Sequence, residues 1–207
     1  MSRGRFITLE GIEGAGKSTV AGFARDWLHA RGIRVVLTRE PGGTPLAERV
    51  RDIVLTPGSE IITPEAEALL MFAARAIHLA NLVRPALERG EWVISDRFTD
   101  ATRAYQGGGR GLALELIEHL ASVVHGDLSP DATLLLDLPV REGLARARDR
   151  GGARDRFEQE RQAFFERVRA SYLALAQRNP GRIHLIDASR PLEAVEQSVA
   201  ACLEALL

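Results

Sequence analysis

The sequence is poor in lysine and cysteine, and both shortages exclude classes of protein. Lys17 is the only lysine beside 26 arginines, so the chain cannot carry the Asn-Lys-x-Asp motif expected of a GTPase-type nucleotide switch. The lone Cys202 excludes an internal disulfide. The five histidines have no metal-ligand spacing to each other or to this cysteine. A zinc site or a cysteine nucleophile therefore has little support.

An excess of either charge and long apolar runs are also absent. The 27 basic and 28 acidic residues give a net charge of −1, so nothing general favours binding to nucleic acid or to a membrane surface. No apolar run approaches the roughly eighteen residues of a membrane span. The short basic lead before the first apolar run lacks the hydrophobic region of a signal peptide. We expect a cytoplasmic protein that binds neither nucleic acid nor membranes.

One stretch, residues 5–26, organises the chain. Gly11, four residues, and then Gly16-Lys17-Ser18 fit the P-loop template, between an apolar run and a helical pattern. Such glycines bring backbone N–H groups close to phosphate oxygens at the positive end of a helix. Lys17 is expected to reach the terminal phosphates and Ser18 to ligate Mg²⁺. The residues predicted to bind ATP phosphates are Gly11, Ile12, Glu13, Gly14, Ala15, Gly16, Lys17, Ser18 and Thr19.

Apolar runs and helical patterns alternate along the rest of the chain. This alternation predicts one α/β domain over residues 1–207, with a five-stranded parallel sheet surrounded by helices and right-handed crossovers. Pro85 is expected to kink or break the helix that runs from 63 toward 90. The predicted strands are 6–9, 33–38, 92–95, 131–137 and 182–187, and the other predicted helices are 17–30, 46–55, 112–125, 154–179 and 191–206.

Polar residues follow two of these strands, at the sheet edge where ligands bind in open α/β proteins. Arg39 opens a turn, 39–44, that contains one proline and two glycines, so it is either a positioned guanidinium facing an anion or a solvated turn residue. Asp96 and Arg97 end the third strand. We interpret Asp96 as part of the Mg²⁺ environment and Arg97 as a phosphate clamp, the alternative being a surface acid–base pair.

Two further segments are candidates for the wall of a substrate pocket. Phe72 and Arg75 are three residues apart on one helix and would combine a stacking ring with a hydrogen-bonding fork, although a phenylalanine on an apolar helix is more often core. Residues 99–111 carry polar and aromatic side chains and then three glycines, 107–109, that we interpret as a flexible hinge. The wall residues expected here are Thr102, Tyr105 and Gln106.

Residues 141–156 form an arginine cluster. Six arginines against three acidic residues give a local net charge of +3, and the pair Gly151-Gly152 interrupts the cluster. The segment is a solvated helix end, a nucleic-acid arm or a mobile lid that closes on phosphates. The glycine pair favours the lid.

Taken together, these motifs resemble the bacterial thymidylate kinases (dTMP kinases), a family of P-loop nucleoside monophosphate kinases. Glu13 within the loop, together with the Arg-Glu-Pro-Gly-Gly-Thr turn at 39–44, is specific to that family, and the resemblance covers essentially the whole chain. It implies a five-stranded parallel sheet wrapped in helices, a homodimer, and conversion of dTMP to dTDP with ATP and Mg²⁺. 

The resemblance also implies roles for single residues. It places Glu13 on the sugar 3′-hydroxyl, Phe72 on the face of thymine and Arg75 on its carbonyl edge. Tyr105 would crowd the 2′ position of the sugar, and the base pocket would be lined by Thr102 and Gln106.

The same resemblance implies which charged residues contact the reacting phosphates. Arg39 and Arg97 would bind the acceptor phosphate, and a lid arginine would act in catalysis, Arg150 in the first place and Arg156 in the second. A phosphate monoester with a second pKa of about 6 is mostly a dianion near neutrality, so the reaction needs no strong base. Asp96 is therefore assigned to Mg²⁺ rather than to proton abstraction.

Two other functions stay open on the sequence. A deoxynucleoside kinase on the same scaffold would need a base and little phosphate clamping, which Arg39 and Arg97 argue against. A nucleic-acid-binding ATPase would use the cluster at 141–156 and bind DNA with steep salt dependence.

Overall fold

The computed structural model describes residues 3–149 and 155–207 and contains the predicted parallel sheet. Five strands pair in parallel in the order β2-β3-β1-β4-β5. Each begins and ends within about two residues of the range expected from its apolar run, which confirms the α/β class. The strands are β1 (Phe6–Glu10), β2 (Val35–Arg39), β3 (Trp92–Asp96), β4 (Ala132–Asp137) and β5 (Ile183–Asp187).

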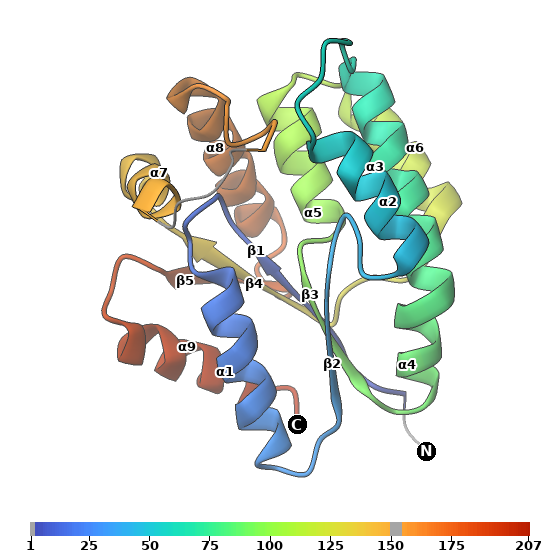
Figure 1. Ribbon diagram of the computed structural model, residues 1–207. Coiled ribbons are helices and arrows are strands. Elements are labelled where there is room, and N and C mark those ends of the chain that lie inside the picture. Colours follow the sequence, from blue (N-terminus) through green and yellow to red (C-terminus); the bar gives the residue numbers. More distant parts are fainter. Residues whose placement is uncertain (1–2, 150–154) are drawn as a thin grey trace.

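Helices cover both faces of the sheet (Figure 1). On one face, apolar side chains of α1 and α9 pack on alternate residues of the central strands. The other face is covered by α4 and α8, and α2, α3 and α6 form a further layer beyond the carboxyl ends of the strands. The helices are α1 (Lys17–His29), α2 (Pro45–Leu55), α3 (Pro64–His78), α4 (Arg84–Glu88), α5 (Thr99–Thr102), α6 (Leu114–His125), α7 (Val140–Asp149), α8 (Gln162–Arg178) and α9 (Leu192–Glu204), with π-helical turns η1 (Leu79–Val83) and η2 (Arg103–Gly109).

The long helical segment begins and changes character where the sequence predicts. The Thr63 hydroxyl accepts a hydrogen bond from the N–H of Ala66, and the helix widens into η1 just before Pro85, whose ring cannot fit a regular turn. By length and composition alone the Pro64–Glu88 segment is apolar enough to cross a membrane. Its buried charged residues all have partners inside the fold, which is typical of a core helix.

Two sequence-based expectations are wrong. The glycines 107–109 are not a hinge, because they lie in η2 against α8, where an added Cβ on Gly109 would come within 2.5 Å of the Phe164 ring. Their missing side chains permit close packing instead. The helix predicted over 154–179 begins only at Gln162, because the Asp155 carboxylate accepts the N–H groups of Phe157 and Glu158 and forms a turn.

Candidate active site

The P-loop lies between β1 and α1 and has the geometry of an anion cradle. Gly14, at φ 76°, leaves no room for a side chain, since an added Cβ would lie 2.1 Å from the carbonyl oxygen of Gly143 in α7. The Lys17 ammonium donates to the carbonyl oxygens of Gly11 and Ile12 at 3.2 and 3.0 Å. Burial, and next the positive charge of Arg97, lower the pKa of Lys17. The Lys17 side chain therefore lies against the backbone of the P-loop, where two hydrogen bonds hold it.

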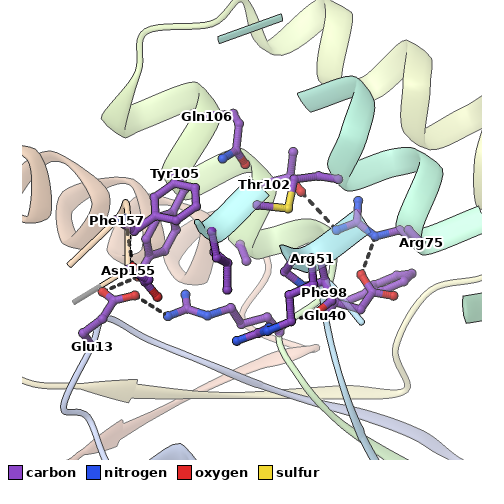
Figure 2. Close-up of a pocket in the computed structure, with 15 residues that line it drawn as sticks. Glu13, Glu40, Arg51, Arg75, Phe98, Thr102, Tyr105, Gln106, Asp155 and Phe157 are labelled. Carbon is purple, nitrogen blue, oxygen red and sulfur yellow. Dashed lines mark hydrogen bonds and ion pairs between the residues drawn. The ribbon is translucent and has the colours of Figure 1, made fainter. Parts of the chain in front are cut away.

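A second cavity opens beside the P-loop (Figure 2). Its walls come from the P-loop, the turn after β2, α2, α3, and the segment from β3 to η2, with residues 155 and 157 closing one side. Six residues predicted from the sequence to bind substrate line it: Glu13, Arg75, Arg97, Thr102, Tyr105 and Gln106. The structure thus brings together side chains that lie as far apart in sequence as residues 13 and 106.

Arg97 is held in a backbone conformation that residues other than glycine rarely adopt. Its φ is 77°, and its N–H donates to the carbonyl oxygen of Leu9 while its own carbonyl accepts from the Ser95 hydroxyl. The next N–H, of Phe98, donates to the buried carboxyl of Glu10 at 2.8 Å. These bonds fix the direction in which the Arg97 side chain leaves the end of β3.

The Arg97 side chain meets the P-loop carboxylate. Its Nη2 donates to Glu13 Oε1 at 2.8 Å, and its guanidinium lies 4.6 Å from the centre of the Tyr105 ring. The Tyr105 hydroxyl donates to Glu13 Oε2 at 2.7 Å. Arg97 Nη1 is buried and, among the described residues, has no hydrogen-bond partner. A donor of this kind is available to an anionic ligand.

At the opposite end of the cavity, a buried ionic cluster holds Arg75. Arg75 Nε donates to Glu40 Oε2 at 2.6 Å and its Nη2 to the Thr102 hydroxyl at 3.0 Å, while His78 Nδ1 lies 2.9 Å from Glu40 Oε1. Burial alone would raise the pKa of Glu40, but Arg75 and His78 outweigh it and lower this pKa. Arg75 Nη1 has no partner within the described chain.

The two cavities meet at charged side chains. The P-loop cavity is lined by loop residues together with Arg39, Asp96 and Arg146. It shares four lining residues with the second cavity: Glu13, Glu40, Arg51 and Arg97. A ligand in the second cavity and a ligand on the P-loop would therefore face each other at these four side chains.

Phe72 lies next to the cavity wall, because its ring centre is 4.7 Å from the guanidinium of Arg75, which lines the cavity. The ring is buried in a cluster with Ala68 and Ile117, and the adjacent Met71 lines the cavity. The stacking of Phe72 on a base stays a prediction.

The other predicted arginines have separate environments. Arg39 lines the P-loop cavity and not the second one, with its Nη2 paired to Glu48 Oε2 at 2.9 Å. Arg150 lies outside the described residues, as does the glycine pair 151–152. Arg156 is turned toward α2 and α3, because its Nε donates to the carbonyl oxygen of Val54 and its Nη2 to Glu67.

Sequence reasoning missed Arg51, which lines both cavities and donates to the carbonyl oxygen of Pro41 at 2.8 Å. A signal for it was present. Arg51 lies four residues after Ala47 and three before Val54, the fully buried positions of α2, so helical spacing places it on the inward face.

Glu10 gives the region a pH dependence. Burial, and next the charge of Asp100, raise the pKa of Glu10 to about 8, against hydrogen bonds from Tyr172 and Phe98 and the charge of Arg97. The folded state thus binds a proton between about pH 4.5 and 8 that the unfolded state has lost. Stability from this group is therefore expected to fall as pH rises through that window, by a few kcal/mol at most.

A Glu10→Gln variant is expected to remove this slope, because a neutral amide keeps an acceptor for the Phe98 N–H without titrating. Urea unfolding at pH 6 and pH 8.5 measures the difference for both proteins. Equal pH slopes in the variant and the parent would contradict the assignment.

A parallel sheet with a P-loop at its carboxyl edge, joined to a second cavity lined by arginines, defines a P-loop kinase that acts on nucleotides. A family model described as thymidylate kinase matches residues 9–199. The chain belongs to the thymidylate kinase family, and it is a nucleoside monophosphate kinase that phosphorylates dTMP. The deoxynucleoside kinase alternative is not favoured.

Relatives and a solved structure match over nearly the full length. The chain is 59% identical over 204 residues to thymidylate kinase of Pseudomonas fluorescens strain SBW25, covering 99% of this chain and 97% of the relative. It is 60% identical over 195 residues to that of Alkalilimnicola ehrlichii, covering 94% and 90%. The crystal structure of thymidylate kinase from Ehrlichia chaffeensis superimposes with a TM-score of 0.76 at 32% identity, covering 99% of both chains.

Proposed function

We propose that dTMP binds in the cavity of Figure 2 and receives the terminal phosphate of ATP held on the P-loop. The observation that carries this arrangement is the junction of the two cavities at Arg51 and Arg97. In-line transfer requires two polyanions to face each other, and cations at their meeting point reduce the repulsion between them.

The base end of dTMP is assigned to the cluster around Arg75. Its Nη1, which has no hydrogen-bond partner among residues 3–149 and 155–207, is a donor for a thymine carbonyl, and Glu40 and Thr102 hold the guanidinium in place. Met71 and Phe98 supply apolar walls. Phe72, whose ring centre lies 4.7 Å from the Arg75 guanidinium, remains our proposal for the residue that stacks on the base. The sugar is assigned to Glu13 and Tyr105, with the Glu13 carboxylate as the acceptor for the 3′-hydroxyl.

The phosphate end is assigned to Arg97 and Arg51, with Arg39 on the P-loop side. Because the acceptor is already a dianion near neutral pH, binding and charge compensation replace a general base. Lys17 compensates the charge of the transferred phosphate. Arg150 remains our proposal for a lid arginine, since Arg156 is held by Glu67 and Val54.

The residues near the P-loop fit a hard cation. Ser18 is exposed at the start of α1, and Asp96 Oδ1 is buried without a hydrogen-bond partner among the described residues. The described residues contain no group of three or more histidine, cysteine, aspartate or glutamate side chains that could by itself hold a metal ion. Mg²⁺ bound mainly through phosphates and one or two protein oxygens fits such a donor set. Bound Mg²⁺ would offset phosphate charge, and Asp96→Asn with an unchanged Mg²⁺ requirement would refute this assignment.

We also propose a homodimer in the cytoplasm. The helices α2, α3 and α6 lie next to one another (Figure 1). They carry the exposed apolar side chains Ile53, Leu69 and Val123, at 58%, 56% and 71% exposure. Exposed apolar side chains spread over adjacent helices fit a protein interface. Sedimentation equilibrium giving only the 22.6 kDa monomer would contradict the dimer.

Ligand binding tests the acceptor assignment. We expect dTMP to raise the melting temperature by about 5 °C or more at a hundred times its Kd, because binding to the folded state then contributes about 2.7 kcal/mol. Thymidine at the same concentration should shift it little, because it lacks the phosphate that Arg51 and Arg97 bind. Equal shifts for both ligands in a thermal-shift assay would contradict the phosphate clamp.

A further inference from the structure

Glu67 is a fully buried carboxylate that the functional assignment leaves without a role. It lies on α3, and its Oε2 accepts from Arg156 Nη2. Its Oε1 accepts from Gln106 Nε2 at 2.7 Å and from Arg110 Nε at 3.4 Å. One carboxylate thus joins α3, η2 and the end of the arginine cluster, next to the cavity residues Asp155 and Phe157.

The hydrogen bond between Glu67 and Gln106 determines which atom of the Gln106 amide is available to a ligand. Gln106 is buried, lines the cavity, and extends toward the other lining residues in Figure 2. An ionised carboxylate accepts hydrogen bonds and donates none, so Gln106 must turn its NH₂ group to Glu67. A flipped amide would place two oxygens against each other in a buried site. The free end of Gln106 is therefore its carbonyl oxygen, Oε1.

A fixed carbonyl oxygen selects among pyrimidines. Thymine and uracil carry a hydrogen on ring nitrogen 3, between two carbonyl groups, whereas the same nitrogen in cytosine is an acceptor. Gln106 Oε1 can accept a hydrogen bond from the N–H of thymine or uracil. The lone pair on the same nitrogen of cytosine repels this oxygen. A site that leaves a buried polar group unpaired rejects the wrong ligand strongly.

We propose that Glu67 is a positioning residue for base specificity, which locks the Gln106 amide so that only a pyrimidine with an N–H at position 3 is accepted. This rests on the assignment of the base end of dTMP to this cavity. Glu67 acts through Gln106 and does not touch the substrate. Its two charged partners are Arg110 and Arg156.

A double-mutant cycle tests the proposal. The variants are Glu67→Gln, Gln106→Met and the double variant, each assayed for kcat/KM with dTMP and with dCMP. We expect each single change to lower the dTMP-to-dCMP ratio at least tenfold. The double variant should be no worse than Gln106→Met alone, because Glu67 has no other route to the base. For Glu67→Gln the loss should appear mainly in KM for dTMP, with kcat nearly unchanged.

Arg110→Met is the matched control, since it removes a charged partner of Glu67 and leaves the Gln106 contact intact. It should lower the melting temperature and leave the ratio unchanged. If Glu67→Gln does not fold, a lowered ratio in the milder Glu67→Asp supports the proposal and an unchanged one overturns it. Additive effects in the cycle also overturn it. Failure of Gln106→Met to change the ratio would instead refute the base assignment itself.

Discussion

Replacing Lys17 with methionine is expected to lower kcat/KM for dTMP by about a thousandfold. Methionine approximates the four-atom apolar stem of lysine and removes the ammonium group that compensates the charge of the transferred phosphate. The side chain is 8% exposed and its ammonium is already directed over the loop by two backbone carbonyls, so little reorganisation is needed on binding. Steady-state assays of product ADP measure the loss.

The Lys17→Arg variant separates the effect of the charge from the effect of the side-chain shape. A planar guanidinium does not fit where a compact ammonium contacts Gly11 and Ile12 at about 3 Å, so arginine should restore less than a tenth of the activity despite its charge. Arg25→Met, at an exposed position of the same helix, is the control and should leave kcat/KM unchanged. Lys17→Met with more than a tenth of the parent activity would contradict the assignment.

Arg97→Ala is expected to lower kcat/KM for dTMP by about a hundredfold or more, through a higher KM and a lower kcat. The guanidinium reaches both cavities, so it contributes to holding the acceptor and to compensating charge as the phosphates approach. Arg97→Gly should lose as much activity, since the same side chain is absent.

The alanine and glycine variants differ in backbone strain. Arg97 has φ 77°, which glycine adopts without penalty and alanine does not. We expect Arg97→Gly to be more stable than Arg97→Ala by about 1 kcal/mol in urea unfolding. Equal stability of the two variants would show that the backbone relaxes on losing the side chain, and full activity in either would remove Arg97 from the acceptor site.

The P-loop and the sheet could be predicted because their information is local. The loop's glycines, Lys17 and Ser18 are contiguous, and each strand is a short apolar run between turn signals. The location of the residues that follow the strands could be predicted from the topology, because parallel strands bring their carboxyl ends to one edge of the sheet. Arg97 was predicted at this edge for that reason, and its guanidinium donates to the P-loop residue Glu13.

The second cavity was predictable only in part, because its walls meet through tertiary packing. On α3, Met71 lines the cavity, and no local pattern distinguished it from the other apolar residues of that helix. Arg156 was a catalytic candidate because of the family resemblance, and its contact with Glu67, 89 residues away, could not be predicted from local sequence. A run of three glycines such as 107–109 is compatible with a flexible hinge and with close packing between helices. Only the contact with α8 in the folded protein distinguishes the two.

The measurement that tests the central claim most directly is ADP release with MgATP and each of dTMP, dUMP, thymidine, dCMP and dGMP at sub-millimolar concentration. Turnover with dTMP should exceed that with thymidine, dCMP and dGMP by far, with dUMP closest, since one methyl group in an apolar pocket is worth about 1 kcal/mol or a little more. Turnover of thymidine equal to that of dTMP would contradict the phosphate clamp at Arg51 and Arg97. Turnover of dCMP equal to that of dTMP would contradict the base site at Arg75 and Gln106.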